Sequence, residues 1–302
     1  MSNKEKLVFK DISQDFSKNN GKYTTILQKK DDLPHPFLKW AGGKRQLIPQ
    51  MNKYFPKTFN KYIEPFIGGG AVFFYLKPKF SIIIDVNEEL INCYNVIKNN
   101  VKELIDLLKN HKNEKNYFYT IRALDRDEEK FAKLSDVEKA SRMIYLNRCC
   151  YNGLYRVNRK GQFNVPFGKY KNPNFCDKEN LLAVSIALEN AKIIHGSFEI
   201  CLDYAEKEDF IYFDPPYFPI SKTSSFTSYT KENFGNDSQN KLFDTFKKLD
   251  ERCCKLMLSN SNIEYIKNLY SDYRIITLKS KRAINCDPTK RGDIDVCLIL
   301  NF

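Results

Sequence analysis

The chain has 302 residues, enough to bury the core of one large domain or two ordinary ones. Its formal net charge of +12 indicates a polyanionic partner, and 14% aromatic residues make base stacking possible. Nine cysteines without a Cys-x-x-Cys pair and three scattered histidines favour reduced thiols over disulfides or a metal site. We therefore expect a cytoplasmic protein without a signal peptide, a membrane span, a bound metal or an obligatory protein partner.

Residues 1–33 are polar and rich in Lys and Asn, which predicts an extension of little or no structure. The stretch from Phe37 to Arg45 then reads Phe-Leu-Lys-Trp-Ala-Gly-Gly-Lys-Arg and holds the only Trp of the chain. It is not a P-loop, because no Gly lies five positions before Gly43 and no Ser or Thr follows Lys44. Its glycine pair can still bring the backbone close to a small ligand.

The next stretch, residues 62–73, predicts a strand, a glycine loop and the start of a helix. Gly68 and Gly70 form a Gly-x-Gly, but Phe73 stands at the third glycine position, which argues against a dinucleotide such as NAD. A second buried strand follows and ends in Asp85, where such folds place an acid for ribose hydroxyls. We expect a nucleoside cofactor, with the alternative that Asp85 is only the N-cap of the next helix.

A charged sequence with helical periodicity separates this strand from the next. Apolar residues keep helical spacing over 88–110, and Ser135-x-x-Glu138 is a capping box that opens a further helix. We expect the inserted residues 112–190 to form a subdomain. The surrounding domain then consists of residues 34–111 and 191–302.

Within the insert, two short β-like runs flank residues 158–161, which predicts a hairpin. Arg and Lys residues alternate with aromatic ones along 147–171, a mixture that can neutralise phosphates and touch bases. Basic hairpins are also common solvated edges of sheets. The hairpin alone therefore favours nucleic acid only modestly.

Short apolar runs predict the remaining strands of an α/β sheet. These runs lie at 81–84, 192–194, 210–213, 255–258, 274–280 and 294–301, with helical text at 242–249. A Ser/Thr loop at 223–230 and a basic loop at 281–293 connect some of them. We assign the basic loop no role beyond a contact with phosphate.

The most informative stretch is Asp214-Pro215-Pro216-Tyr217, at the end of one of these strands. Open α/β sheets bind ligands at the carboxyl ends of their strands. The prolines hold the backbone extended and supply no N–H, so the carboxylate and nearby carbonyls form a cluster of acceptors beside the Tyr217 ring. Such a cluster suits a planar group with an amine, such as a nucleobase. By itself the motif is equally well explained as a turn.

Together, these motifs resemble those of the Dam-type DNA adenine methyltransferases, over roughly Pro36 to Leu300. The resemblance weakens at residues 283–288. It implies a doubly wound, Rossmann-like methyltransferase sheet with an inserted helical and β-hairpin DNA-recognition subdomain. It also implies transfer of methyl from S-adenosylmethionine to N6 of an adenine flipped out of double-stranded DNA, with GATC as the expected site.

The resemblance gives roles to three sets of residues. The catalytic set is Asp214, Pro215 and Tyr217. The cofactor-binding set is Trp40, Lys44, Gly68, Gly70, Asp85, Phe198 and Asp214. The DNA-binding set is Lys39, Tyr151, Asn152, Leu154, Arg156, Pro166 and Tyr170.

Two competing hypotheses use the same residues. The site could methylate RNA or an amide, although the hairpin argues against this, or the chain could be a DNA-binding protein that only senses the cofactor. The intact Asp-Pro-Pro-Tyr motif disfavours the second. Nothing in the sequence separates a solitary regulator from the partner of a restriction nuclease.

Overall fold

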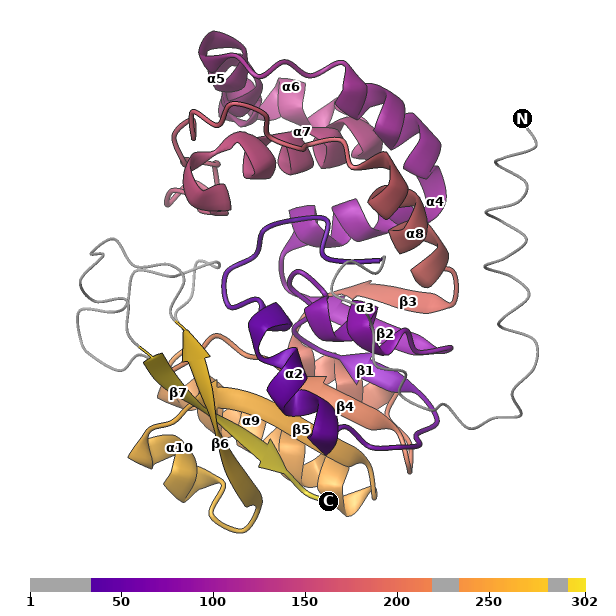
Figure 1. The fold of residues 1–302 in the computed structure, drawn as a ribbon, viewed down its shortest axis with the longest axis vertical. Helices are drawn as coiled ribbons and strands as arrows, with labels where there is room; N and C mark the ends of the chain where they lie inside the picture. Colours follow the sequence, from indigo (N-terminus) through magenta and orange to yellow (C-terminus); the bar gives the residue numbers. More distant parts are fainter. Residues whose placement is uncertain (1–33, 219–233, 282–292) are drawn as a thin grey trace.

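The computed structural model describes residues 34–218, 234–281 and 293–302. The expected extension at 1–33, the Ser/Thr loop at 223–230 and residues 282–292 of the basic loop lie outside the described residues. The described chain forms one seven-stranded sheet with helices on both faces, which confirms the predicted α/β class (Figure 1).

The strand order is β3-β2-β1-β4-β5-β7-β6. Five strands pair in parallel: β1 (Tyr62–Glu64), β2 (Ser81–Asp85), β3 (Ala191–His195), β4 (Phe210–Phe213) and β5 (Lys255–Ser261). The last strand, β7 (Asp293–Leu300), runs antiparallel to both β5 and β6 (Arg274–Lys281). The order reverses between β1 and β4, so the carboxyl ends of these strands border the switch point at which open α/β sheets bind ligands.

Successive side chains of the strands point to opposite faces, and both faces are covered. In β4, Phe210 and Tyr212 join one core cluster, whereas Ile211 and Phe213 join a second. The first includes residues of α2 (Ile48–Met51), α3 (Ala71–Leu76) and α4 (Glu88–Lys109), and the second includes residues of α9 (Asn236–Glu251) and α10 (Glu264–Leu269). All four side chains are fully buried. This burial on both faces explains why β4 reads as an unbroken apolar run rather than an alternating one.

The helices of the sheet layers and of the insert have the following bounds. The α-helices are α2 (Ile48–Met51), α3 (Ala71–Leu76), α4 (Glu88–Lys109), α5 (Lys115–Ala123), α6 (Glu128–Ala132), α7 (Asp136–Cys149), α8 (Lys178–Ala187), α9 (Asn236–Glu251) and α10 (Glu264–Leu269). The 3-10 helices are η1 (Lys44–Gln46), η2 (Asn52–Tyr54), η3 (Leu124–Arg126), η4 (Tyr151–Gly153) and η5 (Phe198–Asp203). No helix within these described ranges is long and apolar enough to cross a membrane.

The insert between β2 and β3 is helical, and α5, α6 and α7 stand away from the sheet in Figure 1. The long α4 runs from the sheet into this unit and packs against α7 and α8. The capping box at the start of α7 is confirmed, because Ser135 accepts from the N–H of Glu138 while Glu138 accepts from the N–H of Ser135. The insert therefore shares α4 with the sheet.

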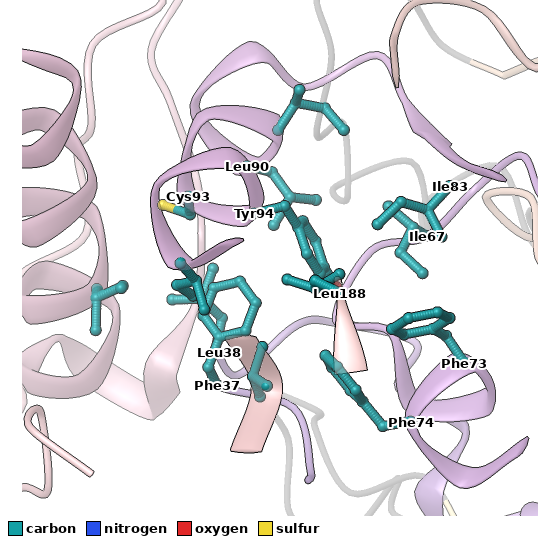
Figure 2. Close-up of a cluster of buried hydrophobic side chains, with 14 of the residues drawn as sticks. Phe37, Leu38, Ile67, Phe73, Phe74, Ile83, Leu90, Cys93, Tyr94 and Leu188 are labelled. Atoms are coloured by element: carbon teal, nitrogen blue, oxygen red, sulfur yellow. The ribbon is translucent and has the colours of Figure 1, made fainter. Parts of the chain in front are cut away.

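The segment before the sheet, residues 34–40, is anchored to the insert. Figure 2 shows Phe37 and Leu38 in the buried cluster that also contains Tyr94 of α4, and the Phe37 and Tyr94 rings meet edge to face with centroids 5.0 Å apart. The Arg148 guanidinium donates to the Phe37 carbonyl at 2.9 and 2.6 Å. The side chain of Asn180 exchanges two hydrogen bonds with the backbone of His35. The segment thus lies against α4, α7 and α8 at once.

Asp209 is fully buried just before β4. Its carboxylate accepts hydrogen bonds from the N–H groups of Lys61 and Glu206 at 2.9 and 2.8 Å. The ammonium of Lys61 lies 3.4 Å from the same carboxylate. Asp209→Ala leaves these donors without their acceptor, so the free energy of unfolding measured with urea should fall by about 3–5 kcal/mol.

The control is Glu208→Ala, whose ion pair with Lys255 is open to solvent. Because water screens such a pair, the urea concentration at the midpoint of unfolding should be close to that of the wild type. Equal midpoints for the two variants would show that Asp209 does not hold the start of β4.

Candidate functional site

The site is centred on Asp214, which follows β4 at the switch point of the sheet. Its Oδ1 lies 2.6 Å from the Nζ of Lys44 and accepts from the hydroxyl of Ser259 at 2.9 Å. The same Nζ donates to the carbonyl of Gly42 at 2.5 Å and lies 4.6 Å from the centroid of the Tyr217 ring. Two motifs far apart in the sequence, 37–45 and 214–217, therefore meet through one ion pair.

This ion pair is largely shielded from water, with 5% of the Lys44 side chain and 18% of the Asp214 side chain exposed. Burial raises the pKa of Asp214, and the Lys44 ammonium and the Ser259 hydroxyl oppose that rise. Burial is the largest single influence and lowers the pKa of Lys44, but the charges and hydrogen bonds of Asp214 and Tyr217 together outweigh it, so the pKa is raised overall. Each ion therefore depends on the other to remain charged in this environment.

Two groups that the sequence analysis did not single out complete the surroundings of Asp214. Ser259, in the last part of β5, links the carboxylate to the Tyr212 hydroxyl, which lies 3.1 Å from the Ser259 oxygen. Glu64, at the end of β1, is 2% exposed and accepts from the Tyr62 hydroxyl at 2.8 Å. Burial raises the pKa of Glu64 well above its usual range, and the charge of Asp214 adds to the rise.

Asp85 ends β2 and faces the glycine loop that follows β1. Its two oxygens accept from the N–H groups of Gly68 and Asn87, each at 3.0 Å. The helix that follows is capped by Asn87, whose side chain accepts from the N–H of Leu90 at 2.9 Å. The capping interpretation of Asp85 is therefore wrong. Burial raises the pKa of Asp85, against the hydrogen bonds from Asn87 and Gly68.

The glycine loop is held against Trp40. Gly68 and Gly70 have φ of 45° and 72°, which side chains rarely tolerate. A Cβ on Gly68 would lie 2.8 Å from Cδ1 of Trp40, and one on Gly70 would lie 2.7 Å from the Tyr94 hydroxyl. That hydroxyl donates to the Gly68 carbonyl at 2.9 Å. Only glycine allows this loop to lie so close to the indole and to α4.

Phe198 opens η5, separated by two residues from the end of β3, at the same end of the sheet. Its ring stacks on Phe66 of the glycine loop, with centroids 5.3 Å apart and planes 24° from parallel. Only 7% of Phe198 is exposed. Phe66 is partly buried and was not selected from the sequence. Its ring connects Phe198 to the glycine loop.

The predicted hairpin is confirmed as a tight turn with one antiparallel bridge, between Val157 and Phe163. Backbone hydrogen bonds from Asn158 to Gln162 and from Asn164 to Arg156 close its two arms. The exposed Arg156 guanidinium donates to the Asn164 side chain at 2.7 Å, and no longer strand forms in the described chain there.

The other candidates for DNA contact flank this turn. The N–H of Tyr151 donates to the Pro166 carbonyl at 2.8 Å, and the Tyr151 side chain is 55% exposed. The Nζ of Lys39 lies 4.9 Å from the Tyr170 ring centroid. Asn152 takes a positive φ of 57° within η4, and Leu154 packs partly buried against the core.

Known proteins share this sequence over most of its length. The family described as D12 class N6 adenine-specific DNA methyltransferase matches residues 40–284. The chain is 46% identical over 281 residues to the type II methyltransferase M1.LlaDCHI of Lactococcus lactis subsp. cremoris, covering 92% of this chain and 99% of that protein. It is 47% identical over 287 residues to the type II methyltransferase M.MjaIII of Methanocaldococcus jannaschii, covering 88% and 99%. A DNA adenine methylase of Haemophilus influenzae is 36% identical over 269 residues, covering 87% and 92%.

The raised pKa of Glu64 predicts a pH dependence of stability. The folded protein holds this proton more tightly than the unfolded chain, whose Glu titrates near pH 4.3, a value taken as roughly that of a free side chain. The stabilisation is complete below that pH and is lost as the pH rises through the folded pKa. Glu64→Gln cannot titrate, so its free energy of unfolding should fall less between about pH 5 and pH 8 than that of the wild type.

Urea unfolding at several pH values measures the difference, and Glu88→Gln, at an exposed position of α4, should follow the wild-type curve. Parallel curves for the wild type and Glu64→Gln would mean that Glu64 is ionised in the folded protein.

Proposed function

The chain belongs to the D12 class of N6 adenine-specific DNA methyltransferases, and we propose that it takes methyl from S-adenosylmethionine and transfers it to adenine in duplex DNA at the site around Asp214. One observation carries the assignment of the site. The Asp214 carboxylate and the Tyr217 ring already hold an N–H donor between them, the ammonium of Lys44. An adenine amine with its ring over Tyr217 offers the same two contacts.

The residues around the glycine loop suit the proposed cofactor. A Cβ on Gly68 or Gly70 would collide with Trp40 or Tyr94, so only glycine lets the loop keep its course beside Asp85. The two oxygens of Asp85 each accept one backbone bond and keep lone pairs for ribose hydroxyls. We propose that Trp40, Lys44, Gly68, Gly70, Asp85, Phe198 and Asp214 hold the cofactor. When bound, S-adenosylmethionine supplies an electrophilic methyl group on a positively charged sulfur.

The target adenine has to leave the duplex to reach Asp214, at a cost of a few kcal/mol of unstacking, in the usual order of magnitude for base flipping. Lys44 then gives up its contact with the carboxylate. Asp214 and the Pro215 carbonyl accept hydrogen bonds from the two N–H groups of the amine, while Tyr217 stacks on the base. This turns the nitrogen lone pair towards the methyl group, and the carboxylate stabilises the positive charge that grows on N6.

We propose that residues 112–190 read the DNA, and that the recognised sequence is GATC. The support is the exposed Arg156, whose bond to Asn164 a guanine edge can replace, because Arg pairs bidentately with guanine in the major groove. Leu154 and Pro166 offer apolar contact to a thymine methyl. Lys39, Tyr151, Asn152 and Tyr170 complete the proposed DNA surface. Such a substrate places the enzyme in the cytoplasm.

Asp214→Ala tests the site. The loss of the acceptor and of its charge should lower single-turnover transfer of labelled methyl to duplex DNA by at least about 100-fold. Duplex affinity, measured by fluorescence anisotropy, should stay close to that of the wild type because Asp214 is mostly buried. Asp244→Ala, at an exposed position on α9, is the control and should transfer methyl normally. Near wild-type transfer by Asp214→Ala would refute the mechanism.

Arg156→Ala tests the target sequence. If Arg156 reads an outer guanine, the variant should methylate sites with that base altered almost as well as GATC, a loss of discrimination of about 1–3 kcal/mol. Arg159→Ala, on the same turn and also exposed, should instead weaken all sites equally if it contacts phosphate. Mapping of methylated adenines on a plasmid measures both. Wild-type methylation at adenines outside GATC would exclude this target.

A further inference from the structure

Tyr155 connects the hairpin to the wall of the proposed cofactor site. It immediately precedes Arg156, it is 8% exposed, and its ring stacks on Trp40 with centroids 5.2 Å apart and planes 25° from parallel. Trp40 in turn lies so close to the glycine loop that a Cβ on Gly68 would be 2.8 Å from Cδ1 of the indole. A continuous line of packed atoms therefore leads from the hairpin to the loop.

The hairpin also contacts a buried network of charged side chains. The Tyr155 hydroxyl donates to Oε2 of Glu89, on the helix that starts beside Asp85, at 3.1 Å. In the other arm, the N–H of Phe163 donates to Oδ2 of Asp125 at 2.8 Å. The guanidinium of Arg142, 2% exposed, lies 3.5 Å from Glu89 and 2.6 Å from Asp125. Both arms are thus held by carboxylates that share one buried cation.

A buried amide ties the two sides of the stack together. Asn147 accepts from the N–H of Lys39 at 2.8 Å and donates to the carbonyls of Lys39 and Gly153 at 2.9 and 3.0 Å. A Cβ on Gly153 would lie 2.2 Å from Cδ of Lys39, so the two segments are in direct contact. Lys39 is the neighbour of Trp40, and Gly153 lies two residues before Tyr155. The segments that carry the two stacked rings are therefore bonded to each other.

We propose that Tyr155 is a positioning residue that couples binding of DNA at the hairpin to binding of the methyl donor, through its stack on Trp40. The inference rests on the proposed function. Close-packed side chains transmit displacement, so a hairpin fixed by DNA also fixes the indole that lines the cofactor loop. When the second ligand binds, this part of the protein is already ordered. Its binding therefore costs less conformational entropy of the protein, which makes the coupling positive.

Coupling of this kind is reciprocal, and this makes it measurable. Calorimetric titration with S-adenosylhomocysteine, which has no methyl to transfer, gives the cofactor-site affinity of the protein alone and saturated with a GATC duplex. In the wild type the duplex should raise this affinity between about 5- and 150-fold. S-adenosylhomocysteine should raise duplex affinity by the same factor.

Three variants locate the coupling. Tyr155→Leu removes the stack, so the coupling factor should fall to about one, whatever the affinity of each ligand alone. Tyr155→Phe keeps the ring and loses the hydroxyl contacts with Glu89 and Asn87, so most of the coupling factor should remain. Tyr117→Leu is the matched control, because this tyrosine of the same subdomain packs on His111 and Tyr145 and should keep the wild-type factor.

The unaltered protein offers a second measurement, which does not depend on whether Tyr155→Leu folds. Trp40 is the only Trp of the chain, so intrinsic tryptophan fluorescence reports on this stack alone. Addition of duplex without cofactor should shift its emission. Three results would each overturn the coupling: unchanged tryptophan emission, a coupling factor of one in the wild type, or the same coupling factor in the wild type and in Tyr155→Leu. Methyl transfer by the wild type would stand in those cases, whereas its absence on duplex DNA would refute the proposed function itself.

Discussion

The ion pair between Lys44 and Asp214 is the interaction on which the site depends. A charge removed from water at this place is costly unless it has a partner, so in the ligand-free protein each residue stabilises the charge of the other. Lys44 begins η1, shortly after the segment at 34–40, and Asp214 follows β4 at the switch point. The pair therefore links the beginning of the described chain to the end of β4. It also occupies the carboxylate that an incoming adenine amine is proposed to contact.

The remaining contacts fix the parts around this pair. A sheet that is buried on both faces provides a rigid base, and β1 and β4 end side by side in it. The glycine loop after β1 is held by Asp85 on one side and Tyr94 on the other. The insert is not an appendage, because it shares α4 with the sheet and binds the segment at 34–40 through α7 and α8.

Much of the fold was predictable because its signals are local. Buried strands appear as short apolar runs, and the capping box at Ser135 and the turn at 158–161 depend on near neighbours. The meeting of Lys44 and Asp214 is not local, since it depends on where β4 lies in the sheet, and only the family resemblance indicated it. Ser259 carried no signal, because a serine late in an apolar strand has many possible roles. The alternative that Asp85 caps α4 stayed open in the sequence because Asn87 and Asp85 are equally good capping residues and only the helix start separates them.

The anchoring of residues 34–40 has a consequence for the order of events on the ribosome. This segment is made early, but its partners Arg148 and Asn180 and the carboxylate that neutralises Lys44 come much later in the chain. At roughly 5–20 residues per second, the delay between Lys44 and Asp214 is on the order of ten seconds. During synthesis Lys44 is thus without its counter-charge until Asp214 has been made, and the site can assemble only after the whole helical insert has been translated.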